Sequence, residues 1–158
     1  MKENVLQARN PATAKRLAKL IRSRLETMEA DLWRLVRDGS SVIATHAVMA
    51  AAVKHSRLLR DFLDLVVREQ YRLFSPGLTK AMWDRYLDTS VQETTSPTWT
   101  DSTRTKLRRV VFQILVEAGY LENSRSLRLQ PVHLADPVAR YLADHDEHEV
   151  LRCLQVGP

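Results

Sequence analysis

Apolar residues recur at helical spacing along most of the chain. The first run advances in steps of three and four residues and contains Leu17, Leu20, Ile21, Leu25 and Met28. This spacing is typical of one buried face on an amphipathic helix. Asn10 and Pro11 stand just before the run, where an N-cap and a first helical proline belong. The segment 42–53 is apolar all round, which predicts a helix at the centre of a bundle.

The same patterning predicts helices over most of the remaining sequence. They cover residues 31–37, 57–74, 79–90, 102–118, 136–145 and 147–154. Only four glycines occur in 158 residues, which argues against a sheet built from many tight turns. We therefore predict an all-α fold, a compact multi-helix bundle with at most a very short β-hairpin.

The C-terminal half carries a recognisable order of elements. The helix predicted from Ser102 ends at Gly119 and is followed by a polar turn, 122–126, and by alternating segments at 127–129 and 132–134. Helix, glycine and short hairpin in this order is typical of a winged helix-turn-helix. The sequence thus predicts a basic helical N-terminal subdomain, 1–74, and a winged-helix-like C-terminal subdomain, 75–158.

Charge is distributed unevenly along the chain. The formal net charge is +5, but residues 1–25 contain seven Lys or Arg and one acid, Glu3. Residues 136–149 contain five acids against Arg140. A basic field concentrated at one end favours nucleic acid as the partner, and an acidic protein surface second.

One basic stripe lies on the first predicted helix. Lys15, Lys19 and Arg22 follow each other at helical spacing, with Arg16 and Arg24 nearby. Like charges so placed repel each other, so a partner of opposite charge is one explanation for them. The alternative is a face that only keeps the protein in solution.

A second basic face begins the helix at 102. Arg104, Lys106, Arg108 and Arg109 lie near its N-terminus, where the helix dipole disfavours positive charge. Its polar face offers groups that contact phosphates and base edges: Ser102, Thr105, Lys106, Arg109 and Gln113. Arg125 and Arg128 would be phosphate contacts of the wing. The alternative is an ordinary solvated helix face.

Several function classes find no support in the sequence. No GxSxG, GxxxxGK[ST], GxGxxG or HExxH motif occurs, so we expect no enzymatic activity, catalytic residue, cofactor or small-molecule substrate. His145 and His148 sit in an acidic helix end that explains them better than a metal site does. The longest uncharged run, 39–53, is too short to cross a bilayer, and no signal peptide is evident, so we expect a cytoplasmic protein with no membrane partner.

Three blocks of the sequence resemble the BrxA family of bacterial BREX phage-exclusion systems. They are residues 10–36, 50–71 and 102–134, which together cover more than half of the chain. The resemblance implies an all-helical fold with helix-turn-helix-like elements, affinity for double-stranded DNA and no known enzymatic activity. It also implies work beside a DNA methyltransferase, an ATPase and other BREX components. The matched basic segments are 15–24 and 102–113, and we expect this chain to start short of a first family helix.

Together these observations predict a non-enzymatic accessory protein that binds double-stranded DNA mainly through phosphate contacts from basic helices. Two alternatives stay open. One is a protein-protein assembly module that docks another BREX component, such as the methyltransferase. The other is an RNA-binding helical bundle.

Overall fold

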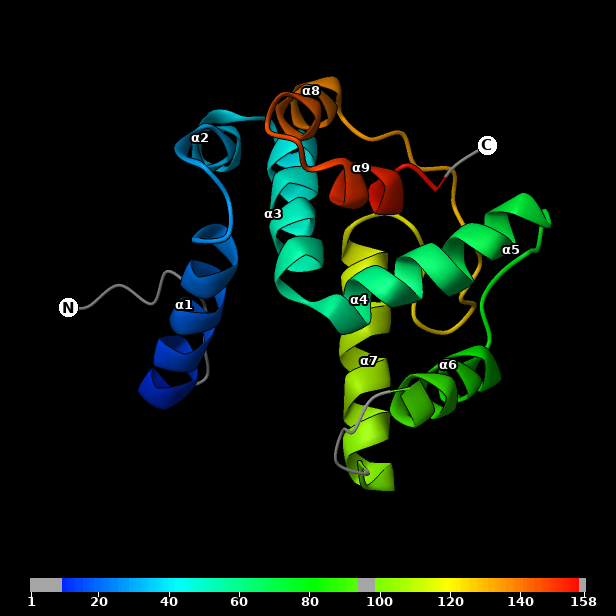
Figure 1. Cartoon of the computed structure of the whole chain (residues 1–158). Coiled ribbons are helices and arrows are strands. Elements are labelled where there is room, and N and C mark those ends of the chain that lie inside the picture. Colours follow the sequence, from blue (N-terminus) through cyan, green and yellow to red (C-terminus); the bar gives the residue numbers. More distant parts are fainter. Residues whose placement is uncertain (1–9, 94–98, 157–158) are drawn as a thin grey trace.

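The structure is a computed structural model that describes residues 10–93 and 99–156. Its elements are α1 (Pro11–Leu25), α2 (Ala30–Asp38), α3 (Ser41–His55), α4 (Arg57–Phe62), the π-helical turn η1 (Leu63–Val67), α5 (Arg68–Arg72), α6 (Lys80–Glu93), α7 (Asp101–Glu117), α8 (Asp136–Asp144) and α9 (His148–Leu154). The all-α prediction is confirmed (Figure 1). The expectation that the chain starts short of a first family helix concerns residues outside the described range, so it stays a prediction.

Local capping explains where several helices begin and end. Asn10 Oδ1 accepts a hydrogen bond from the Thr13 N–H at 2.8 Å, so the predicted N-cap of α1 is confirmed. Ser40 is the N-cap of α3. Thr79 immediately precedes α6, and its Oγ1 accepts a hydrogen bond from the Met82 N–H in the first turn of that helix. Gly119 follows α7 with a φ of +84°, a conformation that glycine adopts without strain.

Helix α3 runs through the middle of the bundle, as its apolar sequence predicts. Most of its second half is buried, from His46 to Val53 except Val48. It packs against α1 and α2 on one side and against α4, α8 and α9 on others. Figure 1 shows α3 between α1 and the pair α4 and α9.

A second part of the core is aromatic. Phe62 of α4 lies edge-on to Trp83 of α6, with ring centroids 4.9 Å apart, and Phe112 of α7 completes the group. Aromatic rings prefer such tilted contacts because their faces are negative and their edges positive. This contact fixes α6 and α7 relative to α4, and so positions one of the two basic helices.

The segment predicted as one helix from 57 to 74 is more complex. It contains the wider turn η1 and ends at Arg72, while Phe74 has a positive φ of 50°. A single wide turn leaves the hydrophobic periodicity almost unchanged, so the pattern does not reveal it. At the other end of the chain, α8 begins at Asp136 itself and its N-cap is Ala135, not Asp136.

The predicted hairpin is reduced to isolated bridges. Leu121 pairs with Leu129 across the turn, and Gly77 pairs with Arg128, both antiparallel. Within the described residues these pairs belong to no named strand, and the winged-helix detail stays a prediction.

The two predicted subdomains share buried side chains. Helices α8 and α9 pack against α3, and one cluster of buried residues includes Leu32 and Phe62 together with Leu142 and Leu154. The division at residue 74 stays a prediction. Among the described residues, no helix is both long and apolar enough to span a bilayer.

Candidate nucleic-acid interface

The outward face of α7 carries the predicted row of polar groups. All five side chains are exposed: Ser102, Thr105, Lys106, Arg109 and Gln113. Lys106 and Arg109 have no ion-pair partner among the described residues, whereas Gln113 donates to Glu117 Oε1 at 2.8 Å. Val110 is also exposed, at 54%, and adds an apolar side chain next to this row.

The other two cations of α7 are held by α6. Arg104 Nη2 lies 2.6 Å from Asp88 Oδ1, and Arg108 Nη1 lies 3.3 Å from Asp84 Oδ1. Arg104 also donates to the Asp84 carbonyl oxygen. These contacts account for half of the positive charge near the N-terminus of α7. Asp84 and Asp88, like the two arginines, are spaced by four residues, but this spacing does not by itself show that α6 packs against α7.

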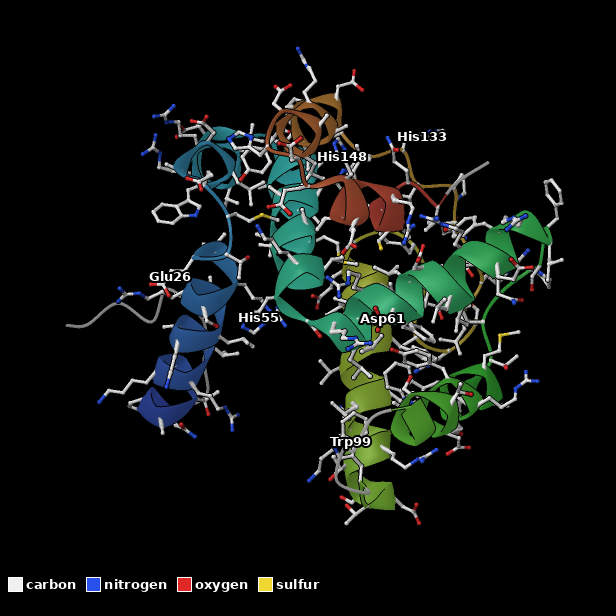
Figure 2. All side chains as sticks on the ribbon, viewed as in Figure 1. Glu26, His55, Asp61, Trp99, His133 and His148 are labelled. Carbon is white, nitrogen blue, oxygen red and sulfur yellow. The ribbon has the colours of Figure 1, made fainter. Side chains whose placement is uncertain are left out.

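Helix α1 presents its basic stripe to solvent. Lys15, Arg16, Lys19 and Arg22 are all exposed. Arg22 Nε pairs with Glu26 at 2.6 Å, and Figure 2 shows Glu26 on the side of α1 that faces away from α3. The other three cations have no ion-pair partner within the described part of the chain.

Arg24 occupies a different environment from the stripe. It follows Arg22 by two residues, about 200° around the helix, and therefore points to the opposite side. Its Nε is buried without a hydrogen-bond partner, and burial lowers the pKa of its guanidinium. Arg24 lines a hollow of about 330 Å³ together with Val48 of α3 and with Ile114 and Glu117 of α7.

This hollow shows how the two basic helices are related. The C-terminal parts of α1 and α7 both line it together with α3, and the N-termini of both helices lie toward the same end of the molecule in Figure 1. The basic stripe of α1 and the polar row of α7 are thus carried by two helices that flank one central helix.

The predicted wing contacts lie on the turn after α7. Arg125 and Arg128 are both exposed. Asn123 Oδ1 accepts from the N–H groups of Arg125 and Ser126, each at 2.9 Å, which shapes the turn. Arg128 is fixed by the bridge to Gly77, whose close approach to the Leu127 carbonyl leaves no room for a side chain.

The histidines near the C-terminus have contacts of their own. The His145 ring stacks on Tyr141, and His148 Nε2 lies 3.5 Å from Asp146 Oδ1. No group of three or more possible metal ligands occurs in the described ranges. His46 is a buried core histidine, and its Nδ1 accepts a hydrogen bond from the Ala135 N–H at 3.1 Å.

The fold and these surfaces define an all-helical protein that presents basic faces on two helices of one bundle. The BrxA family model matches residues 1–146, so the chain belongs to the BrxA family. Membership of this family makes it a component of a BREX phage-defence system.

Individual relatives support the assignment. The BREX protein BrxA of Paramagnetospirillum magneticum is 52% identical over 156 residues, which cover 98% of this chain and 78% of that protein. The BREX protein BrxA of Escherichia coli O9:H4 is 31% identical and is covered to 72% of its length, with 96% of this chain aligned. The crystal structure of an uncharacterized protein from Magnetospirillum magneticum is similar with a TM-score of 0.90 at 50% identity, covering 99% of this chain and 80% of that one.

Proposed function

We propose that this BrxA-family protein binds double-stranded DNA inside the cell, without enzymatic activity, as an accessory of the BREX system. The observation that carries the proposal is a set of exposed cations on two neighbouring helices that have no ion-pair partner among the described residues: Lys15, Arg16 and Lys19 on α1 and Lys106 and Arg109 on α7.

Such cations cost free energy in the isolated protein. Lys15 and Lys19 repel each other one helical turn apart, and Lys106 lies in the half of α7 where the dipole is unfavourable. A polyanion removes both penalties and releases its own condensed counterions, which is the main source of affinity in non-specific DNA binding. Arg24 is left out of the proposed contact surface because it faces α3 and α7.

Helix α7 supplies the groups that could enter a groove. Hydroxyls of Ser102 and Thr105 and the amide of Gln113 stand in one row with Lys106 and Arg109. These groups contact phosphates in most settings, and only Gln113 and Arg109 match the bidentate patterns that read adenine and guanine. We therefore expect weak sequence preference.

Fluorescence anisotropy with a labelled duplex tests the proposal. Replacing Lys106 and Arg109 with Gln, or Lys15 and Lys19 with Gln, should weaken binding about tenfold or more in low salt, because each variant loses two phosphate contacts. The matched control replaces Arg104 and Arg108 with Gln. It removes the same charge from the same helix, but those side chains already pair with α6, so its affinity should stay close to that of the parent.

An equal loss in all three variants would mean that only net charge matters and that no defined surface binds DNA. Unchanged affinity in the α1 and α7 variants, with folding intact by circular dichroism, would remove the proposal.

A second candidate function is an assembly module that docks another BREX component, such as the methyltransferase. It is favoured by an apolar hollow of about 480 Å³ between α1 and α2, whose apolar walls are Ala18, Ile21, Leu25 and Trp33. Trp33 is 46% exposed and is held by a hydrogen bond from its Nε1 to the Leu25 carbonyl oxygen. Exposed aromatic side chains on a fixed framework are common at protein interfaces.

Co-purification with the methyltransferase after nuclease treatment separates the two functions. Direct docking survives nuclease and is lost in Trp33→Ala, whereas bridging by DNA is lost on digestion. RNA binding, the third candidate, is decided by competition between duplex DNA and structured RNA, because the major groove of an A-form helix is too narrow for α7.

A further inference from the structure

A third hollow, remote from α1, lies between α5 and α9. Its volume is about 390 Å³, within the range of small-molecule sites. Two pairs of side chains, each one helical turn apart, line it: Arg68 and Arg72 from α5, His148 and Arg152 from α9. Gln155 adds an amide. His148 is labelled at the start of α9 in Figure 2.

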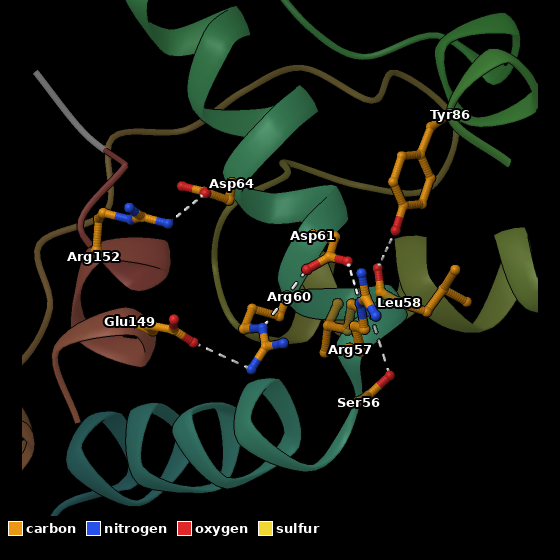
Figure 3. A network of polar contacts seen from close by, with 10 residues as sticks. Ser56, Arg57, Leu58, Arg60, Asp61, Asp64, Tyr86, Glu149 and Arg152 are labelled. Atoms are coloured by element: carbon orange, nitrogen blue, oxygen red, sulfur yellow. Dashed lines mark hydrogen bonds and ion pairs between the residues drawn. The ribbon is translucent and has the colours of Figure 1, made fainter. Parts of the chain in front are cut away.

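The side chains that line this hollow include three arginines and no acid. Asp64 of η1 is shared between two arginines, with its Oδ1 at 3.0 Å from Arg68 Nη1 and its Oδ2 at 2.8 Å from Arg152 Nη2. Figure 3 shows the contact between Arg152 and Asp64. One carboxylate cannot neutralise two guanidinium groups, and none of the residues that line the hollow is acidic.

Arg72 has the loosest attachment of the three arginines. Its contact with Glu69 is 3.6 Å long, beyond hydrogen-bond distance, and 74% of its side chain is exposed. Arg152 is 60% exposed, and its Nε and Nη1 have no hydrogen-bond partner among the described residues. Each guanidinium has five N–H donors, so several remain available on this side of the molecule.

The arrangement holds together the two helices that carry these donors, α5 and α9. Arg68 donates to the Arg152 carbonyl oxygen as well as pairing with Asp64, so the backbone of α9 is tied to α5. Asp64 belongs to the π-helical turn, a feature often found at functional sites. Donors held in place by a rigid framework lose little conformational entropy when a ligand binds.

We propose that this hollow is a binding site for a phosphoryl anion, received by the N–H groups of Arg72 and Arg152 between α5 and α9. The planar guanidinium fork matches the spacing of phosphate oxygens, and Gln155 offers an uncharged donor beside it. The anion would balance the charge that Asp64 leaves uncompensated. Its source is either a free nucleotide or a backbone phosphate of nucleic acid.

Calorimetric titration of the full chain with pyrophosphate and with ATP, at low ionic strength, tests the site. Arg72→Gln should weaken binding about tenfold, because it removes charge-assisted hydrogen bonds. Arg34→Gln is the matched control. Arg34 also pairs with an acid three residues before it, its side chain is 68% exposed, and it lies on α2, away from the hollow. This variant should bind like the parent.

The source of the phosphoryl group follows from a parallel titration with duplex DNA. If pyrophosphate and ATP bind and only Arg72→Gln weakens them, the ligand is a free phosphate. If they do not bind, but duplex affinity falls in Arg72→Gln and not in Arg34→Gln, the site receives a backbone phosphate. The proposal is overturned if Arg72→Gln and Arg34→Gln behave alike towards every ligand.

This site stands apart from the proposed DNA surface. The variants at Lys106 and Arg109 should leave pyrophosphate binding unchanged, because those residues do not line the hollow. Failure of one proposal therefore leaves the other standing.

Discussion

Arginine occurs in three distinct environments in this protein. Arg109 is exposed without an ion-pair partner in the described ranges, Arg104 is paired with Asp88, and Arg24 is turned inward with its Nε buried and unpaired. Of these three arginines, only Arg109 offers its whole guanidinium to a polyanion. A count of cations in the sequence therefore overestimates the charge that a surface offers.

Arg24 gives a prediction at this scale. Replacing it with Met keeps the aliphatic stem and removes a buried donor that has no partner. We expect the free energy of unfolding to rise by about 1 kcal/mol, with DNA affinity unchanged. Urea denaturation measures the free energy of unfolding, and fluorescence anisotropy measures the DNA affinity. A loss of DNA affinity in a stably folded Arg24→Met would show that this side chain reaches the ligand after all.

His46 gives a second prediction, on pH. Burial lowers the pKa of His46, whose Nδ1 accepts a hydrogen bond from the Ala135 N–H and so must be unprotonated. A histidine with a depressed pKa binds fewer protons folded than unfolded, so its stabilising contribution is complete above about pH 6.5 and is lost as the pH falls.

Urea denaturation at pH 7.5 and 5.5 measures this effect. The control is His46→Asn, whose side-chain oxygen can accept the same hydrogen bond but does not titrate. Its free energy of unfolding should fall less between the two pH values than that of the parent. Equal falls would assign the pH dependence to groups other than His46.

At the scale of elements, α7 has one face that contacts α6 and one face that is exposed. One face fastens it to α6 through Arg104 and Arg108, and the other is left free with Lys106 and Arg109. The aromatic contact between Phe62 and Trp83 holds α6 in turn against α4. The unfavourable dipole position of the arginines is thus offset by carboxylates of the neighbouring helix.

This division predicts opposite effects on stability for two variants with the same charge change. Replacing Arg104 and Arg108 with Gln should lower the free energy of unfolding by about 1 kcal/mol, because two partly covered ion pairs are lost. Replacing Lys106 and Arg109 with Gln should leave it unchanged or raise it slightly, since no ion pair is lost and two like charges on one helix face are removed. Thermal and urea denaturation measure the free energy of unfolding of both double variants. Equal destabilisation would contradict the assignment of faces.

Sequence reasoning succeeded where the cause is local. The cap at Asn10 and the stop at Gly119 depend on residues within one turn, and both are confirmed. The π-helical turn was missed because one wide turn barely alters hydrophobic spacing. The pairing of Arg104 with Asp88 depends on how α6 meets α7, which periodicity along either helix does not specify.

At the scale of the whole molecule, α3 determines which surfaces exist together. It is buried through most of its second half, α1 packs on one side of it, and the C-terminal part of α7 lines the same hollow as α1 and α3. The sequence predicted the basic faces on α1 and α7 as separate features. Their relation to a common central helix follows only from tertiary packing, because no local signal links residues 15–22 to residues 102–113.

The exposed cations on α1 and α7 also set how many phosphates the protein can contact. About five cations remain without an ion-pair partner in the described ranges, on α1 and α7 together. Neutralising four to six phosphates corresponds to a slope of about −4 to −5 for the logarithm of the binding constant against the logarithm of salt concentration. This slope reports how many contacts form, whereas affinity at one salt concentration does not.

The most direct test is therefore a salt titration of binding to duplex DNA, by anisotropy, for the parent and two variants. We predict a slope of about −4 to −5 for the parent and for the Arg104 and Arg108 variant, and one shallower by about 2 for the Lys106 and Arg109 variant. A slope near zero in the parent, or a slope that the Lys106 and Arg109 substitutions leave unchanged, would contradict the claim that exposed, unpaired cations on α1 and α7 bind DNA.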